Sequence, residues 1–171
     1  MARAVGILKP PHGAPARLFA LGCLALGVGV LVYLTDRDPS RAALIPTVTA
    51  LSESHLFGAV GLWLPSFVHP FAFSLLTAAL QRPGGPPAYG ACAMWWSINV
   101  GFELAQAPLV STPLASGLRA SMWPAWLVDD LSNYAAHGTF DVADLIAATA
   151  GALAAAVVLR SAHGREASNA Q

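Results

Sequence analysis

Charge is what this sequence lacks most. Of its 171 residues, 11% are charged and 56% are hydrophobic, and the mean hydropathy is +0.57. A soluble domain carries about 25% charged residues, so this chain has too few charges to cover a water-facing surface. The formal net charge is zero, which removes the overall field that would attract nucleic acid or an acidic substrate. The composition predicts a membrane protein whose partners include membrane lipids and no nucleic acid.

Cysteine is also scarce. The chain has two, Cys23 and Cys92, and both stand inside apolar runs. Cysteines in such surroundings are typical of small buried hydrophobic residues rather than of a disulfide or a metal site. We therefore expect no metal centre and no bound cofactor. The sequence also contains no internal repeat, and its length fits a single domain.

Long apolar segments dominate what remains. They predict an all-α membrane protein, a bundle of four transmembrane helices at about 18–35, 66–81, 88–107 and 140–160. The first contains 17 uncharged residues, the lower end of the roughly 17–25 that cross a bilayer. Pro65 favours a second helix that starts near Ser66, and the RPGGPP turn at 82–87 separates it from the third.

The first apolar segment has a second interpretation, a cleaved signal peptide, because basic residues precede it. However, its uncharged run is longer than a usual signal-peptide core. The LVYLTDRD sequence that ends it also offers no cleavage site of small residues. We expect an uncleaved helix that belongs to the bundle.

The basic residues predict the orientation in the membrane. Loops on the cytoplasmic side carry more Lys and Arg than loops on the outer side. With the N-terminus inside, the inner segments hold six (Arg3, Lys9, Arg17, Arg82, Arg160 and Arg165) and the outer loops hold three (Arg37, Arg41 and Arg119). Both termini are therefore predicted to be cytoplasmic, with a segment at 1–17 and a disordered tail at 161–171.

Three ionisable residues fall at a similar depth in the predicted bundle. Glu103 lies 16 residues beyond the turn at 82–87, His69 lies 13 before it, and Asp144 lies 16 before Arg160. At a helical rise of 1.5 Å per residue, these separations are about 24, 20 and 24 Å. Ionisable groups inside a span are costly unless they face a partner, water or the bundle interior. We therefore expect the three to share one polar pocket near the outer surface.

Helical spacing adds neighbours to this pocket. Residues at i, i+3, i+4 and i+7 share a helix face, so the predicted pocket contains His69, Asn99, Glu103, Gln106, Asp141 and Asp144. Two structural alternatives remain open. Glu103 and His69 can form a hydrogen-bonded pair that fixes helix register, and Asp141 suits the N-cap of the fourth helix.

Two further segments complete the predicted architecture. Ala148, Gly151 and Ala155 form a stripe of small residues, which predicts close packing of the fourth helix against a neighbour. The outer loop at 109–138 is about 30 residues long, beyond the usual connection of a few residues. Its Trp-containing part at 122–138 predicts a short amphipathic helix in the headgroup region.

The ordered motifs resemble those of the VanZ-like family of small bacterial membrane proteins. The matching segments are LPSFVHPFAF with His69, FELAQ with Glu103 and Gln106, and DLIAATAG with Asp144 and Gly151. Ala148 stands where the family has Asn, and the link from Gln106 to Asp144 is longer than the family's, which indicates a divergent member. The resemblance covers about 65–159 and implies a location in the bacterial cytoplasmic membrane and a polar cluster. Because the family's name comes from a protein associated with teicoplanin resistance, it also implies a role in envelope or antibiotic tolerance.

Three functions are compatible with these residues. The preferred one is a non-enzymatic envelope protein that binds a lipid-linked or glycopeptide ligand in an outward pocket. The first alternative is a membrane-embedded hydrolase or transferase with Glu103 and His69 as acid–base pair and Asp144 orienting the histidine, or with these three residues binding a cation. The second alternative, a small transporter, is disfavoured because no ionisable residue lies in the inner half of any predicted span.

Overall fold

The chain is helical throughout the parts that the computed structural model describes, residues 14–36, 55–81 and 88–169. These residues form six α-helices, a 3-10 helix and no strand, which confirms the all-α prediction. The long helices are α1 (Ala14–Asp36), α2 (Leu64–Leu80), α3 (Ala88–Ala105) and α6 (Val142–Asn169). The shorter elements are η2 (Gly58–Leu62), α4 (Pro108–Arg119) and α5 (Ala125–His137).

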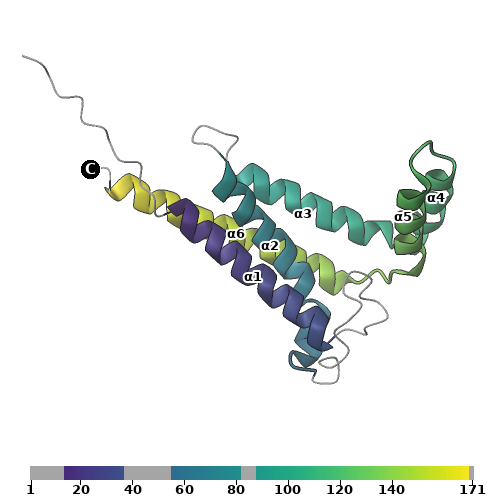
Figure 1. Cartoon of the computed structure of the whole chain (residues 1–171), viewed down its shortest axis with the longest axis horizontal. Coiled ribbons are helices and arrows are strands. Elements are labelled where there is room, and N and C mark those ends of the chain that lie inside the picture. Colours follow the sequence, from purple (N-terminus) through teal and green to yellow (C-terminus); the bar gives the residue numbers. More distant parts are fainter. Residues whose placement is uncertain (1–13, 37–54, 82–87, 170–171) are drawn as a thin grey trace, which may run out of the picture.

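Helix α2 organises the bundle. It packs against α1, α3 and α6, and α3 also packs against α6. The four long helices run in alternating directions, so that the starts of α1 and α3 lie at the same end as the ends of α2 and α6 (Figure 1). Pro65 stands in the first turn of α2, where its missing N–H leaves no intrahelical bond unmade.

Small side chains bring these helices close together. Gly22 of α1 faces Leu76 and Gly29 faces Val68, both on α2. At the end of the bundle where α6 finishes, a buried apolar cluster joins all four long helices and consists of Leu18, Leu75, Cys92, Ala155 and Leu159. The volume of buried apolar side chains is therefore small, as expected when the helices bury mainly small residues against one another.

The outward faces of the long helices are apolar. Leu24 on α1 is 69% exposed, and Leu153 on α6 is 63% exposed. Two helical segments, Pro15–Asp36 and Val142–Ala162, are long and apolar enough to cross a membrane, and 22% and 33% of these segments is buried. The helix α2 is apolar but shorter, with 17 residues. The core helix of a soluble protein would be mostly buried, which these two segments are not.

Several helix boundaries differ from the approximate ones that the sequence predicted. The first helix begins at Ala14, inside the segment that we expected at 1–17, because Pro15 is well tolerated in a first turn. The predicted disordered tail at 161–171 is helical to Asn169, since this stretch lacks proline and extending an existing helix is far easier than starting one. Helix α3 ends at Ala105 rather than at 107, and α6 starts at Val142 rather than at 140. Residues 1–13, 37–54, 82–87 and 170–171, with the turn and basic residues placed there, lie outside the described residues.

The long loop contains more structure than the sequence predicted. We expected one amphipathic helix at 122–138, where α5 indeed lies, but α4 precedes it and packs against it. Pro108 directly follows the predicted third helix, 88–107. In the structure it is the first residue of α4, a position at which proline is favoured. We call α4 and α5 together the hairpin.

Candidate functional site

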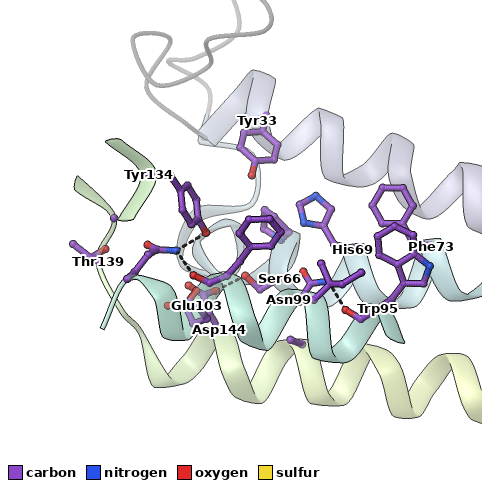
Figure 2. A pocket seen from close by; sticks show the side chains of 16 residues that line it. Tyr33, Ser66, His69, Phe73, Trp95, Asn99, Glu103, Tyr134, Thr139 and Asp144 are labelled. Atoms are coloured by element: carbon purple, nitrogen blue, oxygen red, sulfur yellow. Dashed lines mark hydrogen bonds between the residues drawn. The ribbon is translucent and has the colours of Figure 1, made fainter. Parts of the chain in front are cut away.

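A cavity of about 530 Å³ lies where α3 ends and α6 begins. Five helices contribute to it, namely α1, α2, α3, α5 and α6 (Figure 2). Its polar lining consists of Tyr33, Ser66, His69, Asn99, Glu103, Gln106, Tyr134, Thr139 and Asp144. This volume is within the usual range of small-molecule sites, roughly 300–1,000 Å³.

The structure brings together most of the residues that the sequence singled out. His69, Asn99, Glu103, Gln106 and Asp144 all line the cavity. Asp141 is not in the lining, but its backbone N–H donates a hydrogen bond of 2.7 Å to Glu103 Oε1. Its own carboxylate accepts the N–H of Ala143 at 2.8 Å, which is the N-cap arrangement that we considered for Asp141.

Two carboxylates lie close together at one end of the cavity (Figure 2). Glu103 of α3 accepts the backbone N–H of Asp141, whereas Asp144 of α6 accepts the hydroxyl of Ser66 from α2 at 2.6 Å. Within the described residues, neither carboxylate pairs with a basic side chain, and no Lys or Arg lines the cavity. This end of the cavity is therefore acidic and retains acceptor capacity for a ligand.

His69 occupies a different part of the same cavity. Its ring lies 6.0 Å from the ring of Phe73, centroid to centroid, and Figure 2 shows it apart from the two carboxylates. Asp144 hydrogen-bonds Ser66, so it does not orient the histidine as the acid–base alternative requires. In the described part of the chain, no three His, Cys, Asp or Glu residues are grouped to hold a metal ion. The cation variant therefore gains no support.

Aromatic side chains form the opposite end of the cavity. Phe73 stacks on Trp95 with ring centroids 4.7 Å apart, and Trp95 Nε1 donates a hydrogen bond of 2.9 Å to Thr77 Oγ1. This bond satisfies the indole N–H and fixes the ring. The aromatic end therefore presents a rigid apolar wall beside Asn99. The side-chain amide of Asn99 donates a hydrogen bond of 2.8 Å to the Trp95 carbonyl.

The hairpin closes one side of the cavity through Tyr134 of α5. The Gln106 amide donates a hydrogen bond to the Tyr134 hydroxyl, and the Tyr134 ring meets Phe102 edge to face at 5.6 Å. Burial raises the pKa of the Tyr134 phenol above its usual value. The phenol is therefore neutral at physiological pH and keeps its proton for hydrogen bonding.

Ser66 and Tyr134 are the main cavity residues that the sequence analysis missed. Ser66 could have been found, because it precedes His69 by three residues and so lies on the same face of the helix. Tyr134 gave no such signal, since the fold of the hairpin alone brings it to the cavity. Ala148 lines the cavity and is buried, and a side chain at Gly151 would strike the backbone carbonyl of Phe67. With the fully buried Ala155, these residues lie where α6 meets α2.

No model of a known protein family, no curated protein and no solved structure matches this chain. Its function is inferred from the geometry of the cavity and the chemistry of its residues.

Proposed function

We propose that this chain is an integral membrane protein of the bacterial cytoplasmic membrane, of the VanZ-like kind, that binds an envelope ligand in an outward-facing cavity. The observation that carries the proposal is the cavity itself, which gathers carboxylates, amides and aromatic rings from five helices. The residues of the three VanZ-like motifs, His69, Glu103, Gln106 and Asp144, meet in its lining. The ligand is a lipid-linked or glycopeptide molecule, whose hydroxyl and amino groups suit acidic acceptors.

Four membrane spans are the arrangement that best suits the bundle. Helices α2 and α3, with 17 and 18 residues, are about 26 and 27 Å long at 1.5 Å per residue. This is close to the hydrocarbon thickness of about 30 Å. Helix α2 packs between the longer apolar helices α1 and α6, whereas α3 packs against α2 and α6. Lipid tails would then cover the exposed Leu, Ile and Val side chains of the outer faces.

The hairpin fits the membrane–water interface. Its connection and the adjacent turn of α5 expose large apolar side chains, including Met122, Trp123 and Trp126, and Leu109 is 92% exposed at the start of α4. Tryptophan is enriched at the level of the lipid headgroups. The hairpin would then lie on the outer surface of the bilayer while Tyr134 contacts the cavity.

Binding explains the cavity better than catalysis does. The acid–base alternative requires Asp144 to orient His69, and Asp144 instead accepts the hydroxyl of Ser66. His69, the expected base, has no hydrogen-bond partner within the described residues, and its neighbour is Phe73. Fixed acceptors beside a rigid aromatic wall are typical of a site that recognises a polar group next to an apolar one.

Occlusion of the cavity tests the proposal. We expect full-length protein, extracted gently from its native membrane, to retain an envelope amphiphile that native mass spectrometry detects as an added mass. Asn99→Trp places a large ring in the cavity, so this mass should be lost. The matched control is Leu153→Trp on the exposed face of α6, which should retain the ligand like the unchanged protein.

The comparison depends on folded protein, so both tryptophan variants are compared by circular dichroism and melting temperature. Equal ligand retention in the two folded variants would contradict the proposal, as would the absence of any retained molecule from the unchanged protein.

A further inference from the structure

The cavity is polar at one end and apolar at the other, as an amphiphilic molecule is. Its acidic end holds Glu103 and Asp144, and its aromatic end holds Phe73 and Trp95. Glu103 and Trp95 are eight residues apart on α3, which separates them by about 12 Å along the helix. In the proposed orientation, the acidic end faces the outer surface and the aromatic end lies deeper in the bilayer. A bound lipid has the same direction, with its headgroup outward and its chain inward.

The side of the cavity between α1 and α3 is bordered by exposed residues. Both helices pack against α2, and within the described residues they make no extensive contact with each other. The cavity is bordered there by Tyr33 of α1 and by Ile98 and Phe102 of α3, whose exposed fractions are 38%, 37% and 47%. All three have apolar or amphipathic side chains, which suit a lipid-facing edge.

The cavity volume fits part of a lipid better than a whole one. About 530 Å³ accommodates a headgroup and the first segment of a chain, whereas the remainder of the molecule has to extend outside. An opening towards the bilayer lets that remainder stay among lipid tails, where its transfer to water is never required. A cavity that opened only to water would expose this part of the lipid chain to water.

We propose that the cavity binds one membrane lipid, which enters sideways from the bilayer between α1 and α3. Its headgroup carries hydrogen-bond donors, an ammonium group or sugar hydroxyls, which bind Glu103 and Asp144, while its chain passes Trp95 and leaves over Ile98. This assignment rests on the proposed function and names the class of ligand. Hydrogen-bond donors decide the headgroup, because two carboxylates with no basic partner in the cavity lining accept charge-assisted hydrogen bonds from a headgroup that carries N–H or O–H groups.

Headgroup choice is tested with lipids that share the same dioleoyl chains. Purified full-length protein in detergent is titrated with phosphatidylethanolamine, monoglucosyl diacylglycerol and phosphatidylcholine, and binding is measured by native mass spectrometry. We expect the two donor-bearing lipids to bind about tenfold more tightly than phosphatidylcholine, the effect of one charge-assisted hydrogen bond. Asp144→Asn should reduce this preference, and Asp129→Asn, outside the cavity on α5, should leave it unchanged.

Sideways entry is tested at the edge of the cavity. Ile98→Trp narrows the opening and should slow uptake of the preferred lipid from vesicles, whereas Leu104→Trp, exposed on the same helix but outside the cavity, should not. Circular dichroism and melting temperature are compared for both variants, so that slower uptake is assigned to folded protein.

The outcomes separate the two proposals. If phosphatidylcholine binds as tightly as the donor lipids, or if Ile98→Trp leaves lipid uptake unchanged, the lipid assignment is wrong while an outward binding cavity still stands. If Asn99→Trp retains the native ligand as Leu153→Trp does, the proposed function itself fails.

Discussion

The hydroxyl of Ser66 and the carboxylate of Asp144 join α2 to α6 inside the cavity. This bond crosses between helices that are distant in sequence and that enclose little apolar volume, because small residues line their contact. Polar bonds between helices in a bilayer stabilise by about 0.6 kcal/mol on average and by about 1.7 kcal/mol at most. The pair therefore contributes to stability as well as to the shape of the acidic end.

Ser66→Ala should lower the free energy of unfolding by about 0.5–2 kcal/mol. The substitution removes the donor and leaves Asp144 without its partner. Unfolding in detergent by added dodecyl sulfate measures the loss. The control is Ser116→Ala on α4, where the hydroxyl donates only to the Thr112 carbonyl of its own helix, and where we expect a change within about 0.5 kcal/mol. Equal effects at the two serines would show that the bond between α2 and α6 adds no stability.

At the scale of the helices, α6 approaches the backbone of α2 at Gly151. A side chain there would meet the carbonyl of Phe67, and a backbone atom cannot move aside as a flexible side chain can. Ala148 and Ala155 flank this point and are buried. The stripe of small residues therefore sets how near α6 lies to α2, and with it the width of the cavity that Ala148 lines.

Gly151→Ala should destabilise the protein by about 1–3 kcal/mol, the usual effect of overpacking, and should lower ligand retention because α6 is displaced. The melting temperature in detergent measures the first effect. Gly101→Ala is the matched control, because nothing lies within 4 Å of a methyl group at that position of α3. Alanine's higher helix propensity favours this variant by up to about 1 kcal/mol. A Gly151→Ala protein as stable as the control would refute the close approach.

The sequence predicted only one of the two helices of the hairpin. It predicted one amphipathic helix at 122–138 in the 30-residue link, whereas the structure has two helices there, α4 and α5. The second helix becomes evident only from the packing of α4 on α5, in which Ala115, Val128 and Ala135 are buried. Isolated helices of 12 and 13 residues are marginal in water, so their mutual packing is what favours them.

At the scale of the whole molecule, α1 begins and α6 finishes at one end of the bundle, whereas α3 ends and α6 begins at the other (Figure 1). The cavity lies at this second end. In the proposed membrane orientation, the cavity then faces outward and α6 ends in the cytoplasm. Gln106 lies at the cavity end, after α3, and Gln81 lies at the other end, after α2. These two glutamines provide a matched pair for testing the orientation.

Cysteine is introduced at each of these positions in a background in which Cys23 and Cys92 are replaced by alanine. A membrane-impermeant maleimide applied to intact cells should label Gln106→Cys, whereas Gln81→Cys should react only after the membrane is permeabilised. The reverse labelling pattern would show that the orientation is opposite to the proposed one. Labelling of both from outside would contradict the proposed membrane-crossing arrangement of α2 and α3.

The sequence by itself determined that the described chain is all-helical and where most of its helices lie. Long uncharged runs bounded by proline and by charge specify apolar helices wherever they occur, because this signal is local. The same helical arithmetic gave five of the cavity residues, since depth follows from a fixed rise per residue. Only the tertiary structure decided which side chains meet. Asp144 binds Ser66 rather than His69, and Tyr134 reaches Gln106, because such contacts depend on how helices rotate and cross, which local periodicity leaves free.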